Sequence, residues 1–388
     1  DSFRQTSAKY NYKEVSSPAF EEMGLLKKKS GEEIEQQLFV LEKKGSEEFG
    51  LRFDLTVPIV RMFIEKQKEL PKPVKWFGID RMWRYERPQS GRLREFYQLS
   101  VELFGSDRPE ADAEMINLAI DCLCSLGLTK KDFVVRINNR ILLQNFIESI
   151  GSKNIDAVFR AIDKKSKIPE GAFDEELKKT GLNDDQIKKI KAFLKIKDLK
   201  DINTKSEGLE NLKKIFSILE PKKGFIELDL STARGLAYYT GTVFEIFDRD
   251  GKLRSIMGGG RYDNLVELLG GEKCPGLGFA IGFATLGLLL EEKKLIPKPD
   301  IGVDYYIAPV SDKEYKKAIE ITDSLRKRYS VEIDLMGRSV GKQFDYANKI
   351  KAKKVIVIGE DEIKVKKLTV KDMQTGKESK ISMDSIVK

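Results

Sequence analysis

Alternating hydrophobic and polar positions predict a long antiparallel hairpin in the first third of the chain. Two runs, 74–86 and 93–104, alternate with a period of two residues, and the polar segment 87–92 separates them. Side chains along a strand point alternately to the two faces of a sheet, so each face of the hairpin can be assigned. The apolar face of the second run, which we expect to pack on a core, comprises Tyr97, Leu99, Val101 and Leu103.

The opposite face of this hairpin is polar. The side chains that share it are Arg84 and Glu86 on the first run and Phe96, Gln98 and Glu102 on the second. Covering an arginine, two carboxylates and an amide costs free energy unless these groups meet partners or a ligand. An ordinary solvent-facing sheet surface is the alternative interpretation, but the Arg-Pro-Gln-Ser-Gly-Arg tip at 87–92 favours a binding site.

The pattern changes beyond the hairpin. Residues 150–222 are rich in lysine and have the spacing of amphipathic helices, which predicts a small helical insertion. After a linker at 298–300, strands and helices alternate in the order β-α-β-α-β, which implies a small α/β domain with a largely parallel core sheet. One apolar face of the insertion comprises Ile187, Ile190, Phe193 and Leu194.

Composition excludes several kinds of chemistry. The chain has no histidine, which removes the commonest general base, the Ser–His nucleophile and most zinc sites. Cys122, Cys124 and Cys274 form no CxxC pair, so we expect free thiols in a reducing compartment. Catalysis must therefore rest on arginines, carboxylates, hydroxyls, backbone amides or a hard ion such as Mg²⁺.

Charge and hydropathy limit the partners. A net charge of +8 and a pI near 9.0 permit a nucleic-acid partner without establishing one, because much of the lysine is interleaved with acid. No apolar run approaches the roughly 20 residues that span a bilayer, and the opening residues do not resemble a signal peptide. We expect a cytoplasmic protein without membrane contact.

The hairpin carries a specific resemblance. Residues 84–98, Arg-Tyr-Glu-Arg-Pro-Gln-Ser-Gly-Arg-Leu-Arg-Glu-Phe-Tyr-Gln, resemble motif 2 of class II aminoacyl-tRNA synthetases in its histidyl form. In that class the hairpin holds ATP, a strand arginine meets the α-phosphate and an aromatic ring stacks on adenine. The resemblance places Arg84, Glu86, Arg92 and Phe96 at ATP and Gln89 and Arg94 at the tRNA acceptor end.

A second block is similar to a peptide peculiar to histidyl-tRNA synthetases. It is 233–245, Ala-Arg-Gly-Leu-Ala-Tyr-Tyr-Thr-Gly-Thr-Val-Phe-Glu, and the family's arginine acts at the reacting carboxylate and the α-phosphate. The resemblance therefore implies that Arg234 is catalytic together with Arg84. A buried structural turn is the alternative without that context. Ala237 stands where the family usually has Asp, a change that we expect to be tolerated.

Further segments resemble the family's histidine pocket. Residues 258–263, Gly-Gly-Gly-Arg-Tyr-Asp, resemble a third histidyl segment in which three glycines let backbone approach a ligand closely, although an unstructured hairpin end is the alternative. Asp54 lies where the family more often has Glu for the substrate's α-amino group, and a carboxylate such as Glu102 suits an imidazole N–H donor. The residues implied for histidine are Asp54, Leu55, Thr56, Arg84, Gln98, Glu102, Arg234, Tyr238, Tyr239 and Tyr262.

One departure from the family concerns motif 3. Residues 278–282 preserve its glycine-rich strand, but Thr285 aligns with the arginine that binds the γ-phosphate. We expect Mg²⁺ and another arginine to hold the triphosphate, with Arg261 the first choice and Arg254 the second. Decay of nucleotide binding is the competing explanation.

The resemblance implies an α/β chain whose parts are a catalytic domain on a mostly antiparallel six-stranded sheet (1–149 and 223–297), the insertion (150–222) and an anticodon-binding domain (301–388). It implies a homodimer, with Pro18 at the interface, that uses L-histidine, ATP, Mg²⁺ and tRNA(His), and it implies no protein metal site.

The rival interpretation is the non-catalytic, synthetase-like regulatory subunit of ATP phosphoribosyltransferase, which usually lacks a C-terminal domain like 303–388. A basic nucleic-acid-binding protein without enzymatic activity is a third interpretation.

Overall fold

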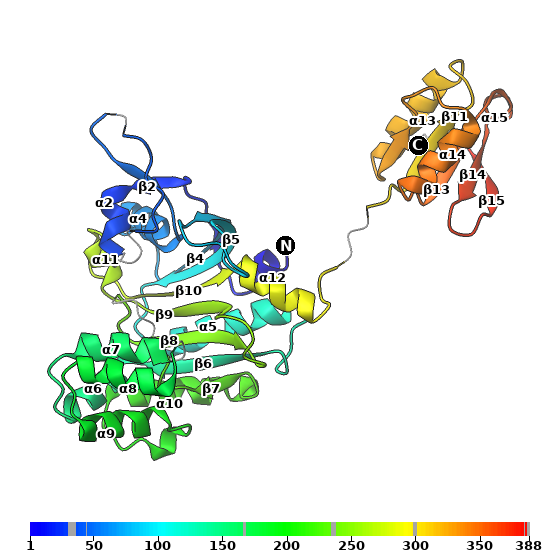
Figure 1. Ribbon diagram of the computed structural model, residues 1–388. Coiled ribbons are helices and arrows are strands. Elements are labelled where there is room, and N and C mark those ends of the chain that lie inside the picture. Colours follow the sequence, from blue (N-terminus) through cyan, green and yellow to red (C-terminus); the bar gives the residue numbers. More distant parts are fainter. Residues whose placement is uncertain are drawn as a thin grey trace. The chain divides into compact units, whose positions relative to one another are not determined.

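The computed structural model describes residues 1–29, 36–43, 45–165, 168–233, 238–297, 301–383 and 385. The chain divides into two compact units, Asp1–Ile296 and Pro297–Lys388, each of which has its own hydrophobic core (Figure 1). Among the described residues no helix combines the length and apolar character that crossing a bilayer requires.

The first unit is built on an eight-stranded sheet. Its strands are, in spatial order, β1 (Lys13–Glu14), β4 (Val74–Trp83), β5 (Glu95–Phe104), β10 (Gly276–Gly282), β9 (Met257–Arg261), β8 (Thr242–Asp248), β6 (Phe133–Asn139) and β7 (Ile226–Leu228). The strands from β4 to β6 pair antiparallel, whereas β1 and β7 add to the two edges in parallel. The predicted six-stranded antiparallel sheet is thus the centre of a wider one, which the two short edge strands extend.

Helices cover both faces of the sheet. One face packs against α1 (Ser2–Lys9), α5 (Pro109–Cys124) and α12 (Phe283–Glu292). The other face packs against α2 (Met23–Lys29), α4 (Thr56–Lys66) and α11 (Leu265–Leu268), beside the small pair of β2 (Phe20–Glu22) and β3 (Phe49–Leu51). The active-site candidates of the hairpin face this second layer.

The hairpin sorts its side chains as the alternation predicts, with one exception. Leu99, Val101 and Leu103 are buried in the core beneath α5. The expectation that Tyr97 joins them is wrong, because its side chain is 46% exposed. Tyr97 lies near the start of β5, close to the hairpin connection, where the guanidinium of Arg81 lies 5.4 Å from the centroid of its ring.

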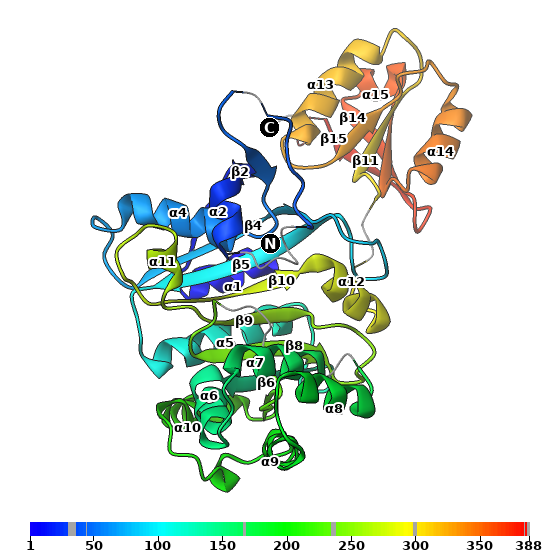
Figure 2. The same cartoon turned by 60° about the vertical axis from the view of Figure 1, so that its left-hand side comes forward.

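Residues beyond β6 form a helical cluster. It contains α6 (Arg140–Ser149), α7 (Ile155–Lys164), α8 (Glu170–Lys179), α9 (Asp184–Leu194), α10 (Glu207–Ile218) and the short turns η2 (Leu199–Asp201) and η3 (Glu220–Lys222). Figures 1 and 2 show these helices beside the β6–β7 edge of the sheet. Asn183 caps α9 through a capping box with Gln186, which satisfies two backbone donors of the helix end. The predicted apolar face of Ile187, Ile190, Phe193 and Leu194 is buried.

The second unit has a five-stranded sheet in the order β12-β11-β13-β14-β15. Its elements are β11 (Tyr305–Pro309), α13 (Tyr315–Arg326), β12 (Val331–Ile333), α14 (Val340–Lys349), β13 (Lys354–Ile358), α15 (Glu360–Lys364), β14 (Lys367–Asp372) and β15 (Glu378–Ser382). The predicted β-α-β-α-β order forms its parallel core. The antiparallel pair β14 and β15 was not predicted, because its charged residues hide the alternation.

Candidate active site

A cavity of 260 Å³ opens on the face of the first unit's sheet that carries the polar side of the hairpin. It lies between the strands β5, β9 and β10 and the start of α4. Its lining consists of Gln37, Phe53, Asp54, Thr56, Arg84, Glu86, Arg92, Gln98, Glu102, Tyr238, Tyr239, Gly258, Tyr262, Gly278, Phe279 and Ala280. Most of the residues that the sequence marks for histidine or ATP therefore meet at one place.

Other marked residues lie elsewhere. Leu55 is buried in the core beside α4 and does not line the cavity. Phe96 lies directly behind Arg84, whose guanidinium carbon is 5.2 Å from the centre of the ring. Arg234 and Ala237 fall outside the residues that the structure describes.

Arg84 leaves the end of β4 and points into the cavity. Its Nε donates a hydrogen bond to the carbonyl oxygen of Phe53 at 3.0 Å, which fixes the side chain without using a carboxylate partner. Burial lowers the pKa of Arg84, while the nearby carboxylates of Asp54 and Glu86 act in the opposite direction. An arginine keeps its charge at neutral pH in either case, so the cavity contains a fixed cation.

The floor of the cavity is a buried carboxylate. Glu102 on β5 is 1% exposed and accepts a short hydrogen bond from the hydroxyl of Tyr262. Gly278 pairs with Glu102 across the strands β10 and β5, and a Cβ at position 278 would overlap the carboxylate. Glycine at this position is therefore needed for the close approach of β10 to the acidic side chain.

An amide lies next to this carboxylate on the same strand. Gln98 is 3% exposed, and its Nε2 donates to the Ser100 hydroxyl at 2.9 Å. This bond orients the amide, so its oxygen is the group that remains available to accept from a ligand donor. Glu102 and Gln98 together give the cavity two acceptors on one strand face.

Aromatic rings form the opposite wall. The rings of Tyr238 and Tyr239 lie 4.4 Å apart, and Tyr238 meets Tyr262 edge-on with a centroid distance of 6.0 Å. A Cβ at Gly260 would come within 2.9 Å of the Tyr239 ring, so the glycine lets that ring pack flat on β9. Ring packing among the three tyrosines and against β9 thus holds this wall.

The tip of the hairpin is an ordered turn. Gln89 and Arg92 exchange backbone hydrogen bonds of 3.2 and 2.9 Å, and Gly91 between them has a φ of 71°, a conformation that favours glycine. Arg92 forms an ion pair with Glu86 at the mouth of the cavity. The Arg94 guanidinium stacks on Tyr85 at 4.2 Å from the ring centre, outside the cavity.

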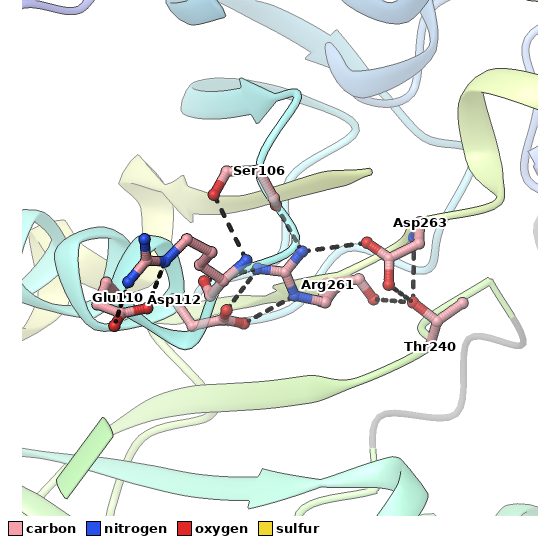
Figure 3. A network of polar contacts seen from close by, with 7 residues as sticks. Ser106, Glu110, Asp112, Thr240, Arg261 and Asp263 are labelled. Atoms are coloured by element: carbon pink, nitrogen blue, oxygen red, sulfur yellow. Dashed lines mark hydrogen bonds and ion pairs between the residues drawn. The ribbon is translucent and has the colours of Figure 1, made fainter. Parts of the chain in front are cut away.

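The phosphate role expected of Arg261 needs correction. Its side chain is 6% exposed and lies outside the cavity, in the network drawn in Figure 3. Its guanidinium donates to Asp112 at 3.2 and 2.5 Å, to Asp263 at 3.1 Å and to the Ser106 carbonyl at 2.8 Å. These acceptors neutralise and satisfy the cation, so the geometry does not support a contact between Arg261 and ATP.

Arg254, the second choice, lies beside the hairpin tip. Its Nη2 donates to Oε1 of Gln89 at 3.1 Å, and its side chain is reachable from solvent. Thr285 also contacts the tip, through a hydrogen bond of 3.3 Å from its hydroxyl to the Gly91 carbonyl. Thr285 and Arg254 therefore contact the same turn, at Gly91 and at Gln89 respectively.

Some cavity groups could not be identified from the sequence. The Phe53 carbonyl is a backbone group without a sequence signal, whereas Gly258, Gly278 and Ala280 belong to the two glycine-rich segments that the resemblance marks. Gln37 reaches the cavity from a segment without periodicity, and its carbonyl accepts from the Tyr85 amide at 2.7 Å. These contacts depend on the tertiary fold.

Comparison with known proteins agrees with this geometry. The sequence model of the histidyl-tRNA synthetase family matches residues 2–286, and that of an anticodon binding domain matches residues 304–388. A histidine--tRNA ligase of Pyrococcus furiosus is 40% identical, with 99% of this chain and 92% of the relative covered. One of Thermococcus kodakarensis is 39% identical, with 99% and 92% covered. The crystal structure of a histidyl-tRNA synthetase from a Nostoc species has a TM-score of 0.81 and 28% identity, with 100% of this chain and 93% of that chain covered.

Proposed function

The chain belongs to the histidyl-tRNA synthetase family, and we propose that it activates L-histidine with ATP and transfers the histidyl group to tRNA(His). The observation that carries this proposal is the meeting of Arg84 with Gln98, Glu102 and Tyr262 in one cavity. A fixed cation beside two buried acceptors suits an amino acid whose carboxylate reacts and whose imidazole donates hydrogen bonds.

Histidine would lie across the floor of the cavity. The Glu102 carboxylate and the Gln98 amide oxygen would accept from the imidazole, and Asp54 with Thr56 at the start of α4 would receive the ammonium group. Tyr238, Tyr239 and Tyr262 would enclose the ring. Specificity follows because an amino acid without ring donors would leave the buried acceptors unpaired.

ATP would enter above the histidine carboxylate. Arg84 would contact the α-phosphate, Phe96 would lie under adenine, and Glu86 with Arg92 would contact the nucleotide at the hairpin. One carboxylate oxygen of histidine attacks the α-phosphorus, the bond to the bridging oxygen breaks, and pyrophosphate leaves. A terminal ribose hydroxyl of tRNA then attacks the carbonyl carbon of the adenylate, and AMP leaves. Positioning and charge stabilisation by Arg84 and Arg234, together with the charge that Mg²⁺ would supply, would carry the first step without a protein nucleophile.

Mg²⁺ would come with the nucleotide. Phosphate oxygens and water would hold most of its coordination positions, as is usual for Mg²⁺ at nucleotides. Glu86, one of the carboxylates that line the cavity, would contact it. The ion would neutralise charge on the triphosphate, and we propose that Arg254 rather than Arg261 assists at its far end.

The second unit would bind tRNA. A cavity of 590 Å³ along α14 has Arg338, Lys342 and Lys349 in its lining against one carboxylate, Asp345, and this excess of positive charge suits an anionic partner. Gln89 and Arg94 at the hairpin tip would face the acceptor end. We further propose a homodimer located in the cytoplasm, as the family resemblance implies.

The rival regulatory role is not favoured. The relatives named as ligases match the chain over 99% of its length, which includes the region where the anticodon binding model matches. The test is charging of a tRNA(His) transcript with labelled histidine in the presence of each other amino acid in excess. We expect the protein to attach labelled histidine to the tRNA, and we expect only an excess of unlabelled histidine to reduce the label on the tRNA. Absence of charging at millimolar ATP and Mg²⁺ would contradict the proposal.

A further inference from the structure

The peptide that connects β7 to β8 carries Arg234 and the two wall tyrosines, and a single residue bonds to both of its described ends. Arg140 donates from Nη1 to the carbonyl oxygen of Ala233 at 2.9 Å. Its backbone amide donates to the carbonyl oxygen of Gly241, also at 2.9 Å. Ala233 directly precedes Arg234, so one of these bonds fixes the backbone next to the proposed catalytic arginine.

The place of Arg140 in the fold is itself fixed. It is the first residue of α6, directly after Asn139, whose side chain accepts from the amides of Ile141 and Leu142 and so caps the helix. The chain direction at this point is set by β6, which pairs with β8, the strand that Gly241 precedes. The backbone of Arg140 therefore cannot move independently of the sheet beneath the cavity.

The guanidinium of Arg140 rests on the insertion. Its central carbon is 4.2 Å from the centre of the Phe159 ring on α7, a distance at which a planar cation is attracted to an aromatic face. Burial lowers the pKa of Arg140, and the carboxylates of Asp156 and Asp163 on the same helix favour its charged form. These three residues are spaced by three and four positions, so α7 turns one face toward the arginine.

We propose that Arg140 is a positioning residue for histidine activation, and that helix α7 supports it through Phe159. The proposal rests on the function proposed above, because it gives Arg140 no contact with substrate. None of the described residues of 150–222 lines the cavity, yet through this contact the insertion influences the geometry of the reacting groups.

The far end of the same peptide has a separate attachment. The Thr240 hydroxyl donates to Asp263 at 3.0 Å and its amide donates to the Arg261 carbonyl at 2.8 Å, within the network of Figure 3. Loss of the Arg140 side chain would therefore release mainly the Ala233 side, where Arg234 lies, and leave the tyrosine side attached. This asymmetry predicts a defect in the chemical step rather than in histidine binding.

The test compares Arg140→Met, which keeps the length of the side chain, with Arg140→Lys, which keeps the charge but not the planar fork. Phe159→Leu removes the ring support, and Arg160→Met, an exposed position on the same helix, is the matched control. Histidine-dependent ATP–pyrophosphate exchange gives kcat and KM, thermal unfolding reports the fold, and amide hydrogen exchange follows the peptide that contains Ser231, Thr232 and Ala233.

We expect kcat in Arg140→Met to fall about 10- to 100-fold, the scale of a small misplacement of a reacting group, while KM for histidine and ATP changes less than about threefold. Arg140→Lys and Phe159→Leu should show smaller losses in kcat, and Arg160→Met none. Amide exchange should quicken in Arg140→Met while the melting temperature stays near that of the wild type.

Wild-type kcat and unchanged amide exchange in Arg140→Met would overturn the proposal. So would an equal loss in Arg160→Met, because that result would indicate general destabilisation of the insertion. If the wild-type protein showed no histidine-dependent exchange at all, the proposed function would fail and the catalytic part of this inference with it. Amide exchange would still report whether Arg140 holds the peptide, so the two failures are distinguishable.

Discussion

The hydroxyl of Thr285 donates to the carbonyl oxygen of Gly91 at 3.3 Å, which joins helix α12 to the tip of the β4–β5 hairpin. Thr285, which aligns with the arginine expected at the γ-phosphate, thus contacts protein backbone. The neutral hydroxyl of Thr285 supplies no charge to a triphosphate, and the buried Arg261 is already neutralised by carboxylates. Arg254, which reaches Gln89 of the same turn, remains as the nearest candidate cation.

Arg254→Ala should therefore raise KM for ATP about tenfold, since an exposed charge contact to phosphate contributes on the order of 1 kcal/mol or somewhat more. KM for histidine should stay unchanged. Steady-state pyrophosphate exchange with varied ATP measures both. The double variant Arg254→Ala, Thr285→Arg should recover part of the loss, whereas unchanged ATP affinity in Arg254→Ala would remove this arginine from the nucleotide site.

Glu102→Gln should weaken histidine binding by about 10²-fold, because a charge-assisted hydrogen bond to the imidazole becomes a neutral one in a buried site. The amide keeps the volume of the carboxylate and can still accept from Tyr262, so the fold should persist. KM for histidine in exchange assays, with the melting temperature as control, checks this. A histidine KM close to that of the wild type would assign Glu102 to structure alone.

Gly278→Ala should destabilise the first unit by about 1–3 kcal/mol, because the added methyl meets the Glu102 carboxylate and the Val101 carbonyl in a packed sheet. Gly282→Ala on the same strand is the matched control, since its Cβ meets no heavy atom of the described residues within 4 Å. Chemical denaturation of both variants measures the difference. Equal stability of the two would show that β10 does not approach Glu102 closely.

Removal of Pro297–Lys388 should impair tRNA charging far more than pyrophosphate exchange, because the first unit has its own core and contains the whole cavity. Charging by the full chain should also decrease steeply with salt, as phosphate contacts require. Parallel charging and exchange assays of the truncated and full-length proteins give the ratio. Charging that survives truncation at matched salt would refute the tRNA role of the second unit.

The sequence predicts those parts of the fold that have a strong local period. The two strands of the hairpin, the α9 face of Ile187 and Ile190, and the parallel core of the second unit all follow from alternation or helical spacing. The parallel pairing of the short strands β1 and β7 does not follow from the sequence, because it depends on neighbours far along the chain.

In the candidate site, too, some features follow from the sequence, and others depend on residues far apart in the chain. The resemblance identifies side chains such as Gln98 and Glu102, and alternation places them on one face. The expected role of Arg261 at ATP fails, because the sequence does not show that Asp112, 149 residues away, neutralises the guanidinium. The bond from Arg140 to the carbonyl of Ala233 is likewise invisible, since a backbone acceptor has no sequence signal.

Histidine-dependent ATP–pyrophosphate exchange by the purified full-length protein tests the central claim most directly. It requires the amino-acid pocket and the nucleotide site to act together, and it needs no tRNA. The account predicts exchange with histidine, no exchange with other amino acids, and a strong loss in Glu102→Gln at subsaturating histidine. Absence of exchange at millimolar ATP, Mg²⁺ and histidine, or equal exchange with another amino acid, would contradict it.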